Sequence, residues 1–289
     1  MPKPKPPERA LPWLATLLLA FSCVALAAPQ AKLLPFWKQS DEFNKTRIDH
    51  SAWGEFLRKY ASEHESGINR VDYASVASHD RAALDAYIDG LEAIAIRSYN
   101  RNEQFAYWVN LYNAATVRLV LEQYPIRSIT KISFSLFGFG PWDEPLLKVE
   151  KQLLSLNDIE HGILRPIWRD KRIHYVVNCA SLGCPNLMLK PFNSRDIEAQ
   201  LSHAEHEFVH HPRGFALEGG SLRLSKIYEW YASDFGANEL AVAKSLIAIK
   251  TSEIPEDDEE ALAVYQDWLE SPKQKRRISY NYDWSLNRP

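Results

Sequence analysis

The sequence predicts a single helix-rich α+β domain with a small sheet. Apolar residues recur at helical spacing in several segments, whereas the extended segments between them are short. Apolar residues make up 46% of the chain and aromatic residues 12%, so the chain can bury a substantial core. Residues 28–289 contain no repeat and no low-complexity tract, and we expect one globular unit there.

Residues 1–27 have the pattern of a secretory signal peptide. Three basic residues precede an apolar run over 11–26, and Ala25-Leu26-Ala27 fits a cleavage site of small residues. An uncleaved membrane anchor is the alternative, but Pro12 interrupts the run and small residues end it. We expect a periplasmic or secreted protein with no transmembrane segment after cleavage.

The charge and the cysteine content limit the classes of partner. The full chain has a formal net charge of −3, and removal of a basic leader makes the remainder more acidic, so nucleic acid is not an expected partner. After cleavage Cys179 and Cys184 are the cysteines that remain, so the core rather than a disulfide framework must hold the fold. We predict no cofactor, and a small-molecule or cell-envelope substrate as the partner.

The strongest helical pattern covers residues 102–122, which are apolar nearly all the way round. Tyr124-Pro125 ends the pattern, and we expect a buried central helix. Asn110 and Asn113 lie on one face of it, and a buried amide without a partner costs about 1–3 kcal/mol. Either backbone from a neighbouring loop binds these amides, or they line a polar cleft.

The other expected elements follow in chain order. Amphipathic helices lie within 49–91 around a short extended piece at 70–73, and a capping box at Ser155 begins a helix that continues to Trp168. Later elements are a helix over 195–209, an extended segment over 222–224, a short helix over 225–236, a helix over 239–249, a helix whose acidic first turns are 256–260, and a strand over 277–287.

Residues 172–185 combine a histidine, an asparagine and two cysteines at the end of an apparent β-strand. In a regular strand His174 and Asn178 share one face and Cys179 lies on the other, so a direct pair of His174 with Cys179 requires the strand to break at Asn178. Three hypotheses remain open: a thiol active site, a disulfide between Cys179 and Cys184, and a zinc site that adds His161 or His174.

His206-Glu207-Phe208-Val209-His210 matches the H-E-x-x-H pattern of zinc metalloproteases. Its surroundings are polar, with Glu205 before it and Pro212 soon after it, whereas a zinc-binding helix normally continues within a core. We therefore interpret the motif as a solvated helix end and predict no metal ligands there.

Five ordered segments resemble the domain of unknown function 547 family: Phe105–Asn113, Leu154–His161 with Leu164-Arg165, Ile173–Pro185, Leu224–Phe235 and Tyr282–Asn287. The resemblance covers about 73–287 and implies no biochemical activity. It places the family's histidine, asparagine and cysteine residues at His161, His174, Asn178, Cys179 and Cys184, and it does not include the H-E-x-x-H motif. The aromatic helix followed by a histidine-bearing strand is also distantly similar to the papain and transglutaminase-like arrangement.

The leading functional hypothesis is a thiol-dependent hydrolase or acyltransferase of the cell envelope. Cys179 is the predicted nucleophile, His174 or His161 the base, and Asn178 or Asn110 the orienting or oxyanion-binding amide. The alternative is a non-catalytic binding module in which Cys179 and Cys184 form a disulfide. Its ligand cleft is lined by Asn110, Asn113, His161 and Arg165.

Overall fold

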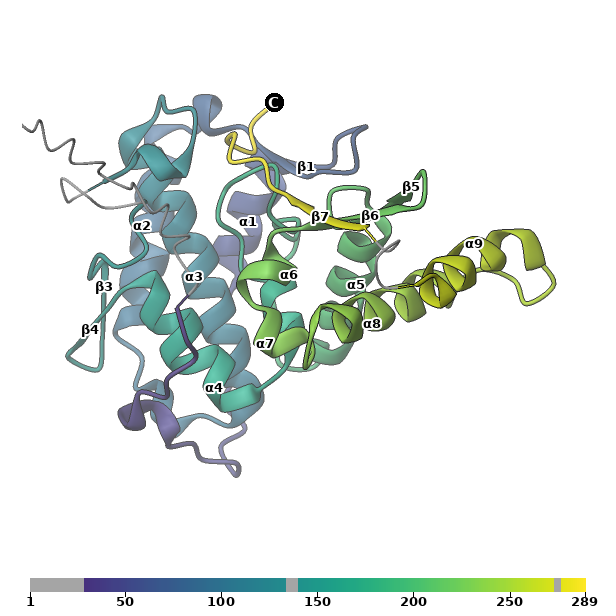
Figure 1. The fold of residues 1–289 in the computed structure, drawn as a ribbon. Coiled ribbons are helices and arrows are strands. Elements are labelled where there is room, and N and C mark those ends of the chain that lie inside the picture. Colours follow the sequence, from purple (N-terminus) through teal and green to yellow (C-terminus); the bar gives the residue numbers. More distant parts are fainter. Residues whose placement is uncertain (1–28, 134–139, 273–276) are drawn as a thin grey trace, which may run out of the picture.

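The computed structural model of the chain describes residues 29–133, 140–272 and 277–289 (Figure 1). The predicted signal peptide, 1–27, lies outside the described residues. The described residues form a helix-rich α+β fold with small sheets around one contiguous hydrophobic core, as the sequence predicts.

The helices are α1 Ser51–Tyr60, α2 Ser78–Glu92, α3 Arg101–Gln123, α4 Arg165–Trp168, α5 Ile197–His210, α6 Ile227–Trp230, α7 Ala232–Phe235, α8 Glu239–Thr251 and α9 Glu259–Glu270. Short 3-10 turns occur at Pro35–Lys38, Tyr73–Ser75, Ile96–Ser98, Ile129–Lys131 and Lys171–Tyr175, and a π-helix covers Asp158–Leu164. The strands are β1 Ala61–Ser62, β2 Arg70–Val71, β3 Leu147–Val149, β4 Gln152–Leu154, β5 Phe215–Glu218, β6 Ser221–Ser225 and β7 Arg277–Asn281.

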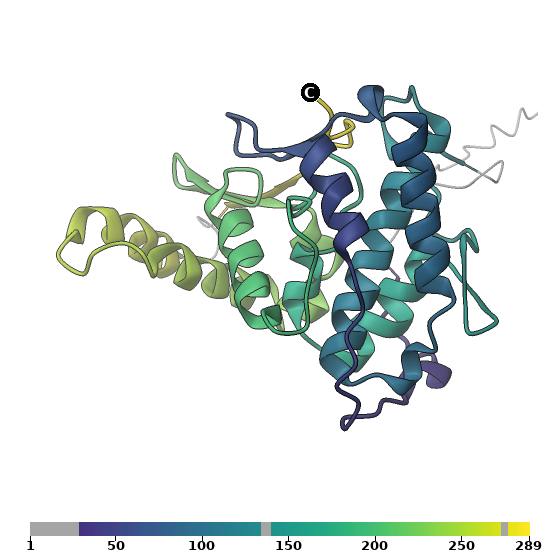
Figure 2. The ribbon, with the colours of Figure 1, turned by 180° about the vertical axis from the view of Figure 1, so that it is seen from behind.

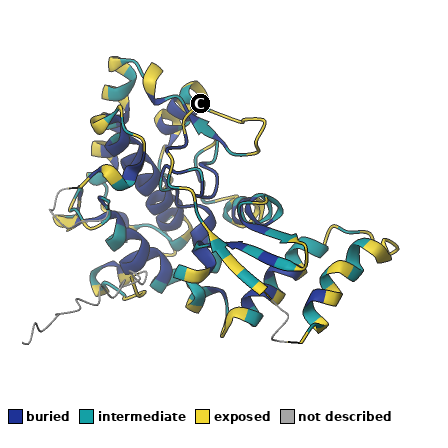
Figure 3. Ribbon diagram, turned by 45° about the horizontal axis from the view of Figure 1, so that its top comes forward, coloured by how far each residue is buried: buried dark blue, intermediate teal, exposed yellow. Residues whose placement is uncertain are grey.

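Helix α3 is the centre of the fold, as predicted for 102–122. The Asn100 side chain caps it by accepting a hydrogen bond from the Glu103 N–H at 3.0 Å. Buried residues occur on all sides of α3, which Figure 3 shows as a dark helix inside the bundle. Helices α1 and α2 pack beside it, and the π-helix with α4 lies on another side (Figures 1 and 2).

The second half of the fold is built on the three-stranded sheet β5–β6–β7. Strands β5 and β6 form an antiparallel hairpin whose turn, Gly219-Gly220, has positive φ at both residues, which suits a tight hairpin turn. Strand β7 pairs with β6 in parallel, with Leu222 opposite Ile278. The predicted strand over 277–287 is thus confirmed over Arg277–Asn281, and its continuation makes a single bridge between Leu286 and Ser181.

The prediction of a β-strand that contains His174 is wrong, because Lys171–Tyr175 is a 3-10 helix. Its backbone bonds are local, such as Ile173 N–H to the Asp170 carbonyl, and the Asp170 side chain caps the turn by accepting from Arg172 N–H. The β-branched pattern predicts burial correctly, but no neighbouring strand pairs with this segment in the described structure. The premise for the papain-like similarity, a histidine-bearing strand, is therefore wrong.

Helices α8 and α9 extend the second half away from the central bundle (Figure 1). The acidic residues of 256–260 do begin a helix, α9, which Asp258 caps by accepting from Ala261 N–H at 3.1 Å. Within the described ranges, no helix has the length and apolar character needed to cross a membrane.

Candidate functional site

Cys179 lies in a loop between the 3-10 helix that contains His174 and the turn at Cys184. Its neighbours Asn178 and Ala180 are buried, whereas Cys179 itself is half-buried. Helix α3 fixes the start of this loop through Asn113, whose amide donates to the Val176 carbonyl at 2.9 Å and accepts from the Asn178 N–H at 2.8 Å. The Asn113 side chain thus supplies the hydrogen bonds that a neighbouring strand would otherwise make.

The Asn178 side chain closes the loop on itself. Its Oδ1 accepts from the Ala180 N–H at 2.8 Å, and its Nδ2 donates to the Pro185 carbonyl at 2.7 Å. Ala180 has a φ of 56°, a left-handed conformation that is unusual for a residue with a Cβ atom. The local turn therefore depends on Asn178, which orients Cys179 through the backbone.

Three side chains surround the Cys179 sulfur. The Cys184 Sγ lies 3.0 Å away, the Ser181 Oγ 3.3 Å and the Tyr282 Oη 2.9 Å. Tyr282 comes from the segment after β7 and also contacts Ser181, at 3.0 Å between the two hydroxyl oxygens. The sulfur therefore has two hydroxyl groups and a second thiol within hydrogen-bonding distance.

These neighbours shift the pKa values of the two thiols in opposite directions. Burial raises the pKa of Cys179, but the hydrogen bonds from Cys184, Ser181 and Tyr282 outweigh it and the net pKa is lowered. Burial and the adjacent Cys179 sulfur raise the pKa of Cys184 well above its ordinary value. Burial also raises the pKa of Tyr282, which therefore keeps its proton and remains a donor. Cys179 is the thiol that ionises first.

The C-terminal segment approaches the cysteine loop closely. Gly183 N–H donates to the Asp283 carbonyl at 2.8 Å, and Leu182 N–H donates to the Ser285 carbonyl at 2.8 Å. A Cβ atom on Gly183 would lie 2.7 Å from the Asp283 backbone nitrogen, so a side chain there would push the two segments apart. This contact positions Tyr282 beside the Cys179 sulfur.

The expected disulfide between Cys179 and Cys184 is not formed in the described structure, where both residues are free thiols. Their sulfur atoms are 3.0 Å apart, which is longer than the ~2.05 Å of an S–S bond. The two sulfurs share a hydrogen bond instead.

A second polar group is buried between the π-helix and α7. His174 lies between two carboxylates, with its Nδ1 3.3 Å from Glu160 Oε1 and its Nε2 2.8 Å from Asp234 Oδ2. Arg165 pairs with the same Asp234 through two nitrogen atoms, at 2.6 and 3.0 Å. The Tyr231 ring stacks on His174 with the ring centres 4.0 Å apart. We call these residues, with His161, the polar cluster.

Opposite charges stabilise the polar cluster. Burial raises the pKa of Glu160, but the charges and hydrogen bond of His161, His174 and Arg165 outweigh it and bring this pKa to about 2. Burial lowers the pKa of His161, and the Arg165 charge adds to this while the Glu160 charge opposes it. Arg165 donates to His161 Nδ1 at 3.0 Å. Hydrogen bonds from His174 and Arg165 outweigh partial burial and lower the pKa of Asp234.

The structure does not bring the predicted base to the predicted nucleophile. Within the described chain no hydrogen bond or ion pair joins Cys179 to His161 or His174, because the polar cluster holds both histidines. The zinc site of two sulfurs with a histidine is not assembled either. Among the described residues, only His206, His210 and Glu253 place three ligand atoms from histidine, cysteine or carboxylate side chains within 4.8 Å of one another.

The two asparagines proposed as ligand-binding residues bind backbone. Asn110 donates to the Phe192 carbonyl and accepts from the Phe192 N–H, both at 2.9 Å, and Asn113 holds the cysteine loop in the same way. Both amides are therefore bound by backbone of neighbouring loops, which is the first of the two alternatives given for them above. A direct role for them in binding a ligand stays a prediction.

Two cavities adjoin these groups. One of about 200 Å³ is lined by Gly183 and Tyr282 beside the thiol loop, together with Ile68, Leu182, Pro212, Arg213, Arg223, Asn281 and Asp283. The other, of about 450 Å³, is lined by Arg165 and Asp234 of the polar cluster, together with Ala31, Leu33, Pro166, Arg169, Asp170, Lys171 and Ser233.

Sequence reasoning did not find Tyr282, Ser181, Glu160 or Asp234 as site residues. Tyr282 and Asp234 are distant in the sequence from the residues they contact, so no local spacing indicates them. Tyr282 and Asp234 do lie in two of the quoted family-like segments, as part of Tyr282–Asn287 and Leu224–Phe235. Those segments were the available signal.

The fold and site define a helix-rich α+β protein with a half-buried, hydrogen-bonded thiol beside a buried ionic cluster. Residues 96–209 match the family model described as "Protein of unknown function, DUF547", and this part of the chain is a DUF547 family domain. The domain contains α3, both cysteines and most of the polar cluster. No curated protein and no solved structure matches the chain.

Proposed function

We propose that this protein is a thiol-dependent enzyme of the cell envelope, a hydrolase or acyltransferase in which Cys179 is the nucleophile. The observation that carries the proposal is the set of hydrogen bonds that the Cys179 sulfur makes with Cys184, Ser181 and Tyr282, which lowers its pKa. A thiolate is the reactive form of cysteine, and a half-buried cysteine with such hydrogen-bonding neighbours has the setting of a reactive thiol.

In the proposed reaction the Cys179 thiolate attacks the carbonyl carbon of an acyl donor. A carbon–sulfur bond forms while the carbonyl electron pair moves to oxygen. The intermediate then collapses: the bond from carbon to the leaving group breaks, Tyr282 gives its proton to the leaving group, and a thioester remains on Cys179. Water, in a hydrolase, or another nucleophile, in an acyltransferase, attacks the thioester carbonyl and gives its proton to the Tyr282 oxygen. The carbon–sulfur bond then breaks and the Cys179 thiolate is restored.

Tyr282 is the group best placed to assist. It donates to the sulfur at 2.9 Å before attack, and its raised pKa keeps the proton on its oxygen. When the sulfur loses its negative charge, this O–H is released to stabilise the developing oxyanion or to protonate the leaving group. The polar cluster has a positioning role in this scheme, since its histidines are bound to carboxylates and Arg165 instead of to the sulfur.

The surroundings of Tyr282 supply surface for a substrate. Its ring packs against Trp230 and Trp284, with ring centres 4.9 and 4.5 Å away, and these rings are half-buried. The cavity lined by Arg213, Arg223 and Asp283 also borders Tyr282. Arg223 is paired with Glu218 at 2.8 Å, so Arg213 is the arginine that favours a negative group on the substrate. The aromatic faces favour a flat or ring-shaped apolar part.

The experiment is acylation of the mature protein by p-nitrophenyl acetate, an activated acyl donor, followed by peptide mass spectrometry. We expect a burst of nitrophenol and an acetyl group on the Cys179 peptide. Cys179→Ala should abolish both, whereas Cys184→Ser, which keeps a hydrogen-bond donor, should retain them. Acylation that persists unchanged in Cys179→Ala, or no acylation of the wild-type thiol, contradicts the proposal and favours the non-catalytic binding module.

A further inference from the structure

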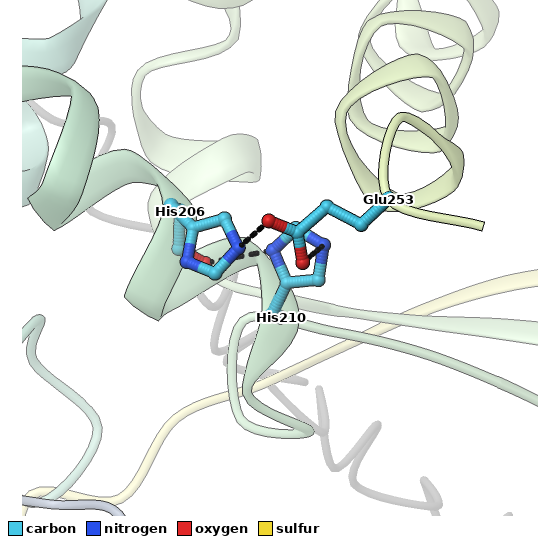
Figure 4. A group of neighbouring side chains, drawn as sticks. All are labelled: His206, His210 and Glu253. Carbon is cyan, nitrogen blue, oxygen red and sulfur yellow. Dashed lines mark hydrogen bonds and ion pairs between the residues drawn. The ribbon is translucent and has the colours of Figure 1, made fainter. Parts of the chain in front are cut away.

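The H-E-x-x-H motif meets a carboxylate that is distant in the sequence. His206 and His210 lie one turn apart at the end of α5, and Glu253 comes from the segment just after α8 (Figure 4). The Nε2 atom of His206 is 2.7 Å from Oε1 of Glu253, and the Nε2 atom of His210 is 3.7 Å from Oε2. Two imidazole nitrogens and a carboxylate therefore converge on one point.

The tautomer of His210 is set for ligation. Its Nδ1 lies 2.9 Å from the backbone carbonyl of His206, an acceptor, so Nδ1 carries the proton and donates it there. The lone pair is then on Nε2, which is buried and has no hydrogen-bonding partner among the described residues. A hydrogen bond of this kind at the second ring nitrogen is the usual support of a metal-binding histidine.

Either a proton on an imidazole nitrogen or a metal ion must lie between these groups. A neutral Nε2 lone pair and a carboxylate oxygen repel each other, so a proton or a metal ion has to account for the 2.7 Å contact of His206 with Glu253. A proton on His206 Nε2 would satisfy that contact, but it would leave the Nε2 lone pair of His210 3.7 Å from the carboxylate without a hydrogen-bonding partner among the described residues. One metal ion satisfies both lone pairs and the carboxylate together, whereas one proton satisfies a single pair.

The three side chains are accessible to solvent, and they lie at a position that favours a cation. The side chains of His206, His210 and Glu253 are 44%, 20% and 58% exposed, so an ion can enter from solvent. The site lies at the C-terminal end of the 14-residue helix α5, where the helix dipole favours a cation. The cation Lys250 lies close by, and its Nζ already donates to the His210 carbonyl at 3.0 Å.

We propose that His206, His210 and Glu253 bind a divalent transition-metal ion of the zinc class. Two imidazoles and one carboxylate suit zinc, cobalt or nickel and leave a fourth position for water. The ion links the end of α5 to the segment after α8, two parts of the chain that Glu253 otherwise joins through ion pairs alone. His210 and Glu253 lie outside the DUF547 match, which ends at residue 209.

This site differs from the protease site that the motif suggests. In a zinc protease the glutamate after the first histidine acts on a metal-bound water. Here Glu207 Oε2 lies 3.6 Å from Nε2 of His203, one turn earlier on α5. Glu207 is therefore assigned no role at the ion, and the ligand that completes the site is Glu253.

The test is titration of the metal-free mature protein with Zn²⁺ by calorimetry, and with Co²⁺ by visible absorption. We expect one ion per chain and the intense visible bands of tetrahedral cobalt. His210→Ala and Glu253→Ala should each weaken binding by on the order of 100-fold, at least as much as loss of a supporting hydrogen bond does at known sites. Glu253 is exposed, so its variant removes a ligand with the fold intact.

Matched controls identify the ligands. His203→Ala and Glu207→Gln change neighbouring residues of α5 and should leave the affinity within about 2-fold, since neither is a ligand. The double variant Cys179→Ala with Cys184→Ser removes both thiols and should also bind the ion normally. Unchanged affinity in both His210→Ala and Glu253→Ala, or loss of binding in the cysteine variant alone, overturns the proposal.

Discussion

Replacement of Asn113 by alanine should both destabilise the protein and change the reactivity of Cys179. The amide of Asn113 binds the Val176 carbonyl and the Asn178 N–H, and its removal leaves two buried backbone groups without these partners. At about 1–3 kcal/mol for each group, the expected loss in the free energy of unfolding is about 2–6 kcal/mol. A loosened cysteine loop should also raise the pKa of Cys179, because its hydrogen bonds require the loop geometry.

Asn110→Ala is the matched control on the same helix. Asn110 also binds one backbone carbonyl and one N–H, both of Phe192, so its removal should cost a similar amount of stability. Phe192 is not part of the cysteine loop, so the pKa of Cys179 should not change. Urea denaturation measures the stabilities, and the pH dependence of iodoacetamide alkylation measures the pKa. Equal changes in that pKa for both variants, or a stability loss below about 1 kcal/mol for Asn113→Ala, would contradict the assigned role of Asn113 in holding the cysteine loop.

Three further predictions concern the two polar groups. Tyr282→Phe should raise the pKa of Cys179 by about 1–2 units and slow its alkylation at neutral pH, because a hydrogen bond to a charged group contributes about 1.5–3 kcal/mol. The hydroxyl of Tyr280 binds Glu239 instead, so Tyr280→Phe should leave the pKa of Cys179 unchanged. Gly183→Ala should move the C-terminal segment from the thiol and reproduce the Tyr282→Phe shift, and an unshifted pKa would count against the close contact. The pKa of Glu160 is lowered from 4.5 to about 2, so the ionised Glu160 stabilises the fold by about 3 kcal/mol above pH 4.5, and this stabilisation is lost as the pH falls towards 2. Urea denaturation across this pH range should therefore show that Glu160→Gln loses less stability on acidification than the wild type. An identical loss in the two proteins would contradict this role of Glu160.

The helices were predictable because their signals are local. Residues 102–122 carry an uninterrupted apolar pattern with a proline after it, and α3 follows closely as Arg101–Gln123. The acidic residues 256–260 likewise indicate a helix start that Asp258 caps. In these segments the pattern, the cap and the packing agree.

The segment containing His174 shows the limit of such patterns. Alternation predicts burial, but a strand also needs a partner strand, and here the side chain of Asn113 takes that place. The location of the thiol site was predictable from the local group of cysteines. Its chemistry was not, because Tyr282 and Asp234 come from distant segments and Asp234 draws His174 into the polar cluster.

The most direct measurement is the rate of iodoacetamide alkylation of the mature protein as a function of pH, mapped to the peptide with Cys179 and Cys184, before and after reduction. We expect Cys179 to be alkylated without reduction, ahead of Cys184, with an apparent pKa below the ordinary value of about 8.5. Alkylation only after reduction, or Cys184 reacting first, would contradict the claim that Cys179 is an activated nucleophile.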